Sequence, residues 1–230
     1  RRVVITGGEP TLHRDFAEII AAACGVIAGV SLSTNGTLLF PDRVDALLSA
    51  GVHCVQIGLN ALFDDRSGSD EGMERIVEGA RALLEGGAEV TLAAVLTRSI
   101  IDDLDEVERL GEMIRPAQLR IGPLIGCHEG VRMCMPERER MRDAILELRR
   151  WSRRTGVMSV FGDGVLEEGR IRGAKGGRQR FCFVGTGLLH LEPDGRVYPC
   201  SSLLDAALEL GRVEPASVTE SLMEIWMHSG

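Results

Sequence analysis

The feature that most constrains the fold is an alternation, over the first 125 residues, of short apolar runs with segments that are apolar on one helical face. The apolar runs predict strands at residues 3–6, 30–33, 54–59, 90–96 and 119–124. The segments between them predict helices over residues 15–24, from Pro41 to a stop at Gly51, from Met73 to a stop at Gly86, and over residues 102–115.

Strands that alternate with helices indicate an α/β fold with parallel pairing and right-handed crossovers. Strands this apolar are usually covered on both faces. A (β/α) barrel, a partial barrel and an open doubly wound sheet all agree with the pattern, and periodicity does not choose among them. Each of the three places its ligand sites at the carboxyl ends of the strands.

Composition excludes several classes of function. The net charge of −8 gives little support to nonspecific nucleic-acid binding. No run of about 18 apolar residues predicts a membrane span, and no signal peptide is visible. Six scattered cysteines form no disulfide framework, which favours a reducing cytoplasm. Both ends of the chain look cut, so we expect a fragment of a longer polypeptide.

The pattern changes after Cys134. Residues 136–155 predict a long charged helix, and residues 162–177 are rich in Gly and charge, which is typical of a linker. The apolar runs at 188–191 and 196–198 flank Pro193-Asp194-Gly195, which predicts a β-hairpin. A last helix carries Leu222 and Ile225. We predict a boundary near residue 160, giving domains at 1–160 and 161–230.

The turn Gly7-Gly8-Glu9-Pro10 directly follows the first predicted strand. Two glycines allow a ligand to approach the backbone closely. Glu9 adds a carboxylate, which suits an ammonium group, and Pro10 fixes the exit of the turn. The alternative is a tight β-to-α turn with a solvent-exposed glutamate.

At this turn the sequence resembles the radical S-adenosylmethionine (radical SAM) family. In that family the motif follows the second barrel strand and binds the amino group of the cofactor's methionine moiety. The resemblance therefore implies a cofactor-binding role for Gly7, Gly8, Glu9 and Pro10. It also implies a partial (β/α) barrel in which the five predicted strands are the family's second to sixth.

The resemblance extends to further strand ends, with less specific signals. Ser33 and Asn35 lie in a segment similar to the family's third strand, although an ordinary Asn-Gly turn is an equal alternative. Asn60 stands where many relatives carry an aspartate that faces the ribose. Arg66 is a candidate partner of the cofactor carboxylate, with a surface arginine as the alternative. Ile121 lies in a segment similar to the sixth strand, which often abuts the adenine.

The spacing of the cysteines indicates which cluster-binding motifs of this family the sequence contains and which it lacks. Radical SAM enzymes hold a [4Fe–4S] cluster on Cys-x3-Cys-x2-Cys, and no such spacing occurs here. We expect that motif upstream of Arg1. Cys182 and Cys200 surround the predicted hairpin with a spacing that resembles the SPASM or twitch extension, which binds auxiliary [4Fe–4S] clusters, and thiolates suit such clusters. Two structural thiols are the alternative. Cys127, His128 and Cys134 are weaker candidates for a substrate or cluster pocket.

The resemblance implies a radical SAM oxidoreductase or maturase whose cofactors are S-adenosylmethionine and [4Fe–4S] clusters. A peptide or protein is the leading substrate class, and flavodoxin or ferredoxin is the implied electron donor. One alternative is a radical SAM enzyme that acts on a small molecule or a cofactor precursor. The other is a degenerate relative that binds SAM or a peptide without turnover. No catalytic residue is assigned.

Overall fold

The computed structural model describes residues 2–64, 70–124, 134–161, 188–201 and 204–228. The chain divides into two compact units, Arg1–Glu168 and Gly169–Gly230. The boundary near residue 160 stays a prediction, because the change of unit falls among residues outside the described part. Within the described ranges, no helix is both long and apolar enough to cross a lipid bilayer.

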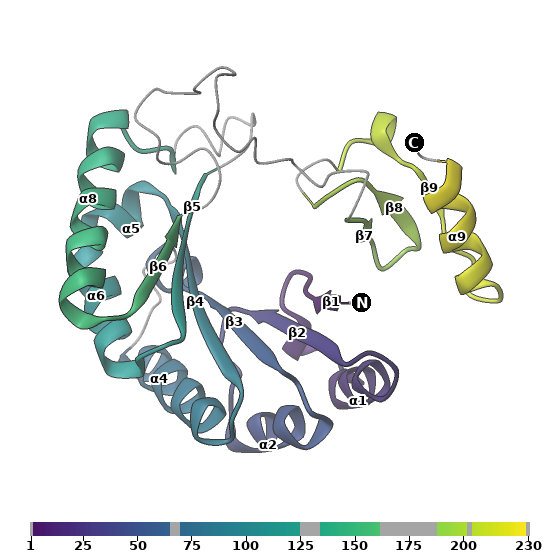
Figure 1. The fold of residues 1–230 in the computed structure, drawn as a ribbon, viewed down its shortest axis with the longest axis horizontal. Helices are drawn as coiled ribbons and strands as arrows, with labels where there is room; N and C mark the ends of the chain where they lie inside the picture. The colour runs from purple at the N-terminus through teal and green to yellow at the C-terminus, as the bar shows by residue number, and fades with distance from the viewer. Residues whose placement is uncertain (1, 65–69, 125–133, 162–187, 202–203, 229–230) are drawn as a thin grey trace. The chain divides into compact units, whose positions relative to one another are not determined.

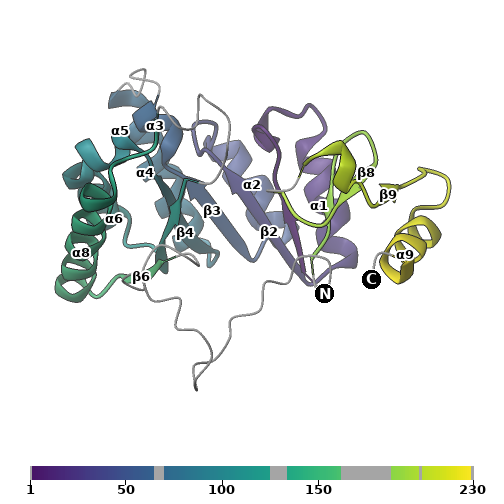
Figure 2. The same ribbon diagram turned by 90° about the horizontal axis from the view of Figure 1, so that it is seen from above.

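The first unit is built on a six-stranded parallel sheet whose strands follow one another in chain order. Figure 2 shows β2, β3 and β4 side by side in this order. The strands are β1 (Arg2–Ile5), β2 (Gly29–Thr34), β3 (Cys54–Gly58), β4 (Glu89–Leu96), β5 (Gln118–Pro123) and β6 (Met158–Phe161). Because all six strands are parallel, their carboxyl ends meet at one edge of the sheet.

Helices follow the outer side of this curved sheet (Figure 1). They are α1 (Phe16–Val26), α2 (Pro41–Ala50), α3 (Asn60–Asp64), α4 (Asp70–Glu85), α5 (Arg98–Asp102), α6 (Leu104–Ile114) and α8 (Arg138–Thr155), with a short 3-10 helix η1 at Pro10–Leu12. Right-handed crossovers that always step in the same direction place their helices on one face of the sheet. Sequential strand order and one-sided helices make a partial barrel, which confirms the predicted fold class.

The two faces of the sheet differ in chemistry. Leu32, Ile57 and Leu92 point to the helices and are fully buried in one continuous apolar core. Ser33 and Gln56 alternate with them and lie half-buried on the opposite face, which we call the inner face. In the described part of this unit the helices cover the outer face only, which corrects the expectation of two covered faces.

Two elements differ from the sequence prediction. The sheet has six strands rather than the predicted five, because β6 pairs with β5 in parallel. This strand has four residues and begins two residues after the α8 cap at Gly156, so its sequence signal is short. The predicted helix over 102–115 is two helices, α5 and α6. The first begins earlier because the Thr97 hydroxyl caps it by accepting the Ile100 N–H at 3.3 Å.

The second unit holds a three-stranded antiparallel sheet and one helix. Its elements are β7 (His190–Leu191), β8 (Arg196–Tyr198), the 3-10 helix η2 (Ala206–Leu208), β9 (Gly211–Arg212) and α9 (Val218–His228). Val197, Val213 and Ile225 form its small apolar core. The predicted hairpin is confirmed: Gly195 turns with φ +89°, and a Cβ there would lie 2.8 Å from the Val213 carbonyl oxygen.

Candidate functional site

The turn after β1 presents bare backbone at the carboxyl edge of the sheet. Gly7 and Gly8 are exposed, and no heavy atom lies within 4 Å of the place where a Cβ would stand on either. Gly7 has φ +151°, a value that side-chain-bearing residues rarely adopt. Pro10 then begins η1, with Glu9 as its N-cap. The turn is therefore open to a molecule that approaches the peptide groups directly.

The Glu9 carboxylate joins this turn to the end of β2. Its Oε1 accepts the Thr11 N–H at 3.1 Å, the Thr11 hydroxyl, and the Thr34 hydroxyl at 2.7 Å. Its Oε2 accepts the Asn35 N–H at 2.6 Å. Thr11 and Thr34 are both buried. We call this arrangement the Glu9 clip, because the Glu9 side chain, in the turn after β1, holds the end of β2 at Thr34, 25 residues further along the sequence.

The Glu9 clip leaves the carboxylate able to accept a further hydrogen bond. Each carboxylate oxygen has two lone pairs, so the three donors at Oε1 share two acceptor directions. In the described part of the chain, Oε2 accepts a single hydrogen bond, so it can accept one more. Glu9 is half-buried rather than fully exposed. The sequence suggested Glu9 as a partner for a cation but did not predict its four donors within the protein.

The turn after β2 is shaped by Asn35 and Gly36. The Asn35 Oδ1 accepts the Thr37 N–H at 3.0 Å and the Thr37 hydroxyl at 2.7 Å. Gly36 has φ +77°, and a Cβ there would stand 2.8 Å from Ile57 Cγ2. The Asn35 side chain therefore stabilises its own turn, while its backbone N–H belongs to the Glu9 clip. Ser33 lies on the inner face, where its hydroxyl accepts from Gln56 Nε2 at 3.3 Å.

The other predicted site residues lie apart from this cluster. Asn60 bonds the β4 backbone with both ends of its amide, donating to the Val95 carbonyl and accepting the Val95 N–H, each at 2.8 Å. Ile121 is 1% exposed and packs in the core under the helices, so its side chain does not line the inner face. Arg66 lies outside the described residues.

The inner face carries polar side chains that the sequence reading missed. Gln56 and Arg120 are linked by a hydrogen bond from Arg120 Nη1 to Gln56 Oε1 at 3.1 Å. Gln118 donates to the Thr91 hydroxyl at 3.1 Å. The available signal was a polar residue at every second position, as in Gln118 and Arg120, inside runs that otherwise read as apolar strands.

Cys54 lies half-buried on this same face. Burial, and then the negative charge of Glu89, raise the pKa of the Cys54 thiol above its ordinary value. Arg120 and nearby hydroxyls oppose that shift. The thiol is therefore protonated at neutral pH, which makes it a weak nucleophile in this setting.

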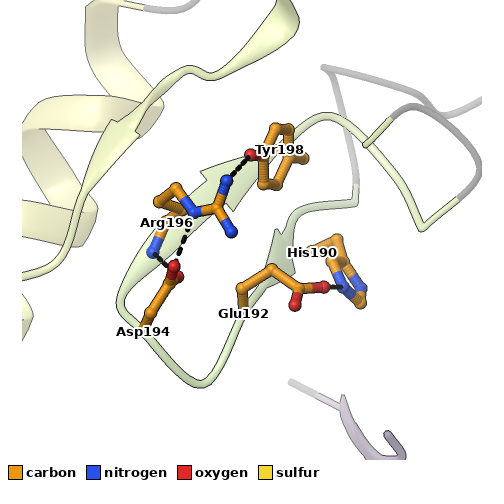
Figure 3. Close-up of polar contacts among 5 residues, drawn as sticks. All are labelled: His190, Glu192, Asp194, Arg196 and Tyr198. Carbon is orange, nitrogen blue, oxygen red and sulfur yellow. Dashed lines mark hydrogen bonds and ion pairs between the residues drawn. The ribbon is translucent and has the colours of Figure 1, made fainter. Parts of the chain in front are cut away.

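The hairpin of the second unit holds a separate polar cluster (Figure 3). The Arg196 backbone N–H donates to Asp194 Oδ1 at 3.1 Å and its Nε donates to Oδ2 at 2.6 Å, and these bonds lower the pKa of the Asp194 carboxyl. Arg196 Nη1 also donates to the buried Tyr198 hydroxyl at 2.9 Å. His190 Nε2 lies 2.5 Å from Glu192 Oε1.

These contacts stiffen the strand that leads to Cys200, which lies two residues after Tyr198 and is half-buried. Its predicted partner, Cys182, lies outside the described residues, as do Cys127 and His128. Cys134 is exposed. In the ranges that the structure describes, no three His, Cys, Asp or Glu side chains gather where they could hold a metal ion.

Comparison with known families gives two matches. Residues 1–114 match the radical SAM superfamily, and residues 182–229 match the SPASM iron–sulfur cluster-binding domain. The first match contains the Glu9 clip and strands β1 to β4. The second contains the hairpin, both predicted cluster cysteines and α9.

Curated relatives fall into two groups. The mycofactocin maturase MftC of Mycolicibacterium smegmatis is 28% identical over 236 residues, which cover 99% of this chain and 58% of the relative. A probable GTP 3',8-cyclase of Methanosarcina acetivorans is 34% identical over 122 residues, covering 50% of this chain and 35% of the relative. The chain thus spans between about a third and three fifths of the length of these relatives.

Solved structures share the fold at low sequence identity. SuiB of Streptococcus suis bound to S-adenosylmethionine has a TM-score of 0.71 at 15% identity, over 89% of this chain and 50% of that chain. The enzyme anSMEcpe with bound AdoMet and the Kp18Cys peptide has a TM-score of 0.67 at 17% identity, over 99% of this chain and 66% of that chain. These likenesses concern the fold alone.

The two family matches together cover most of the chain, and the partial barrel agrees with the structural neighbours. The radical SAM superfamily binds S-adenosylmethionine and a [4Fe–4S] cluster, and SPASM domains bind further iron–sulfur clusters. The chain therefore belongs to the radical SAM superfamily and carries a SPASM iron–sulfur cluster-binding segment.

Proposed function

We propose that this chain is the cofactor- and substrate-binding part of a radical SAM enzyme that modifies a peptide or protein. The observation that carries the proposal is the joint match to a radical SAM domain and a SPASM domain on one chain. The open glycine turn and the Glu9 clip add a physical reason why S-adenosylmethionine would bind at the carboxyl edge of the sheet.

The residues of the turn fit the methionine end of S-adenosylmethionine. The space beside Gly7 and Gly8 lets an ammonium group approach the peptide carbonyls. The remaining acceptor position on Glu9 Oε2 offers a charged partner for that ammonium. Pro10 removes one competing donor from the turn. We therefore assign the four residues of the motif to this end of the cofactor.

The remaining predicted contacts are assigned more narrowly. Asn35 acts through its backbone, since its side-chain oxygen already accepts from Thr37. Asn60 holds the end of β3 beside β4, so it would shape the ribose region rather than donate to it. Arg66 remains the proposed partner of the cofactor carboxylate, and Ile121 would meet the adenine only through its backbone.

S-adenosylmethionine bound at a reduced [4Fe–4S] cluster supplies a 5′-deoxyadenosyl radical that abstracts hydrogen from a substrate. This chain's own part is to hold the methionine end at the turn and to present the inner face to the substrate. Cys182 and Cys200 are proposed ligands of an auxiliary cluster, with the hairpin contacts fixing Cys200. A flavodoxin or ferredoxin is the proposed electron donor, and the cytoplasm is the proposed location.

A peptide substrate is favoured by the relatives that match along the whole chain. MftC, a maturase by name, aligns with 99% of the chain, through both domains. SuiB, whose fold this chain shares, has been seen with the precursor peptide SuiA. The GTP 3',8-cyclases have higher identity but match only about half of the chain, so a small-molecule substrate is the second candidate.

Anaerobically reconstituted full-length protein tests the proposal when it is supplied with S-adenosylmethionine and dithionite. We expect 5′-deoxyadenosine, read by chromatography, and, where a glycine-rich precursor peptide is encoded beside the gene, a mass change in that peptide, read by mass spectrometry. Conversion of GTP with no change in the peptide would favour the second candidate. Absence of 5′-deoxyadenosine under both conditions would support the degenerate, non-catalytic alternative.

A further inference from the structure

A row of polar side chains crosses the inner face of the sheet close to the Glu9 clip. Gln56 Nε2 donates to Ser33 Oγ at 3.3 Å, and Arg120 Nη1 donates to Gln56 Oε1 at 3.1 Å. The row thus links β2, β3 and β5. It begins at the residue before Thr34, whose hydroxyl belongs to the Glu9 clip.

Arg120 brings a positive charge to this face. Its side chain is exposed, and no Asp or Glu oxygen of the described residues lies within 4.0 Å of its guanidinium. Glu89 is placed on the same face by its pairing with Cys54, but it forms no ion pair with Arg120 in the described part of the chain. An arginine held in place by a neutral amide keeps both its charge and most of its donors for another molecule.

We infer that Arg120, oriented by Gln56, binds a carboxylate group of the substrate on the inner face. The inference rests on the proposed function, because a substrate must reach the inner face to meet the cofactor at the carboxyl edge. The Gln56 bond uses one of the five guanidinium N–H groups, which leaves a pair that can bind a carboxylate in bidentate fashion. Pre-orientation by Gln56 reduces the entropy lost when that pair forms.

The single positive charge of the Arg120 guanidinium favours one carboxylate over a polyphosphate as the group that it binds. Arg120 is the one basic residue in the sequences of strands β2 to β5. Arg2 of β1 lies on the same face by its register, but three strands separate β1 from β5. The neighbours of Arg120 in the row are an uncharged amide and a hydroxyl. A triphosphate carries several negative charges and is usually held by several cations or by a helix N-terminus. Peptides carry carboxylates at their C-terminus and on their acidic side chains.

The test compares two probes that differ only in one charge, acetyl-trialanine with a free carboxylate and the same peptide as an amide. Saturation-transfer NMR on the reconstituted full-length protein with S-adenosylmethionine measures both affinities. We expect the acid to bind at least about tenfold more tightly than the amide, a difference of about 1.4 kcal/mol. Arg120→Met removes this preference, whereas Arg142→Met, a change at an exposed arginine on α8, retains it.

Substitutions at Gln56 distinguish the effect of the Arg120 charge from the effect of how Gln56 orients the Arg120 side chain. Gln56→Glu places a carboxylate beside the guanidinium, so it abolishes the preference for the acid. Gln56→Met removes both hydrogen bonds of the amide without adding a charge, and it reduces the preference by a smaller factor. Equal losses in the two variants would contradict the role of the Arg120 charge, and so would an acid preference that survives Arg120→Met.

Two further measurements distinguish a failure of this inference from a failure of the proposed function. GTP is the polyphosphate probe. The carboxylate assignment would be overturned if Arg120→Met weakened the binding of GTP more than the binding of the acid peptide. Affinity for S-adenosylmethionine is measured on the wild-type protein in parallel. A wild-type protein without that affinity contradicts the proposed function. A wild-type protein that binds S-adenosylmethionine but does not distinguish acid from amide contradicts only this inference.

Discussion

At the residue scale, Glu9 combines two roles in one carboxylate. Oε1 takes three donors from Thr11 and Thr34, and Oε2 takes the Asn35 N–H while keeping capacity for one more. Hydrogen bonds to a charged acceptor are among the strongest in proteins. The side chain therefore shapes the turn before any ligand arrives, and a ligand's ammonium meets a carboxylate that is already oriented.

Thr34→Val tests the structural part of this residue. The Thr34 hydroxyl donates to Glu9 Oε1 at 2.7 Å and accepts the Gly36 N–H at 3.1 Å, and the side chain is buried. Valine keeps the shape of the side chain but leaves Glu9 Oε1 and the Gly36 N–H without the threonine hydroxyl. We expect a loss of about 1–3 kcal/mol in the free energy of unfolding, measured in urea. Thr219→Val, at an exposed position in α9, is the control. Equal stability of the two variants would contradict the clip.

At the scale of elements, the α6–α8 contact places an ionisable group, the Glu108 carboxyl, in a partly buried position. Glu108 Oε2 accepts from Arg154 at 3.3 Å, while Oε1 is buried without a hydrogen-bond partner in the described part. Burial is the main cause that raises the pKa of Glu108 above its ordinary value of 4.5, and Glu147 and Asp105 add to it against the opposing charge of Arg154. Folding therefore favours the protonated form of this carboxyl.

The sign of the pH effect follows from this shift. A carboxyl whose pKa is higher in the folded state binds its proton more tightly there, so the free energy of unfolding falls as pH rises from 4.5 through the folded pKa. Glu108→Gln removes that loss. We expect a higher melting temperature for the variant at pH 7 and a difference that shrinks toward pH 4. A lower melting temperature at pH 7 would mean that the Arg154 pair outweighs the cost of burial.

The helices, strands and turns could be predicted from the sequence where their signal lies in neighbouring residues. Gly51 and Gly195 mark a helix end and a hairpin, and both turn with positive φ as that chemistry requires. The long amphipathic helix α8, predicted over 136–155 and observed at Arg138–Thr155, was also predictable. The β6 strand was not, because four residues give too short a period. The link from Glu9 to Thr34 joins distant positions, which periodicity along the chain does not report.

At the scale of the whole molecule, the chain combines a partial barrel with a SPASM segment, and the two units have separate cores. The family matches follow this division, with the turn in the first match and the cysteine hairpin in the second. The polar inner face also belongs to this scale. It arises because sequential right-handed crossovers leave one face of the sheet without helices.

The SPASM match gives a prediction for iron content. Full-length protein reconstituted anaerobically should contain iron and sulfide beyond one [4Fe–4S] cluster. The double substitution Cys182→Ala and Cys200→Ala should lower the iron content, because thiolates are the ligands that such clusters require. Cys24→Ala, at a half-buried thiol in α1, is the matched control. Iron content that is unchanged in the double variant would exclude these two cysteines as ligands.

The central claim is that S-adenosylmethionine binds against the bare backbone of the turn after β1, and one substitution tests it most directly. Gly8→Ala adds a methyl group where no protein atom lies within 4 Å, so the fold should tolerate it while the ligand's space shrinks. Gly25→Ala in α1 adds the same methyl into equally open space away from the site.

The measurement is the affinity of reconstituted full-length protein for S-adenosylmethionine, with melting temperature as the check on folding. We predict that Gly8→Ala weakens binding at least about tenfold, or about 1.4 kcal/mol, at an unchanged melting temperature, and that Gly25→Ala binds like the wild type. Wild-type affinity in Gly8→Ala would contradict the claim that the cofactor lies against this turn.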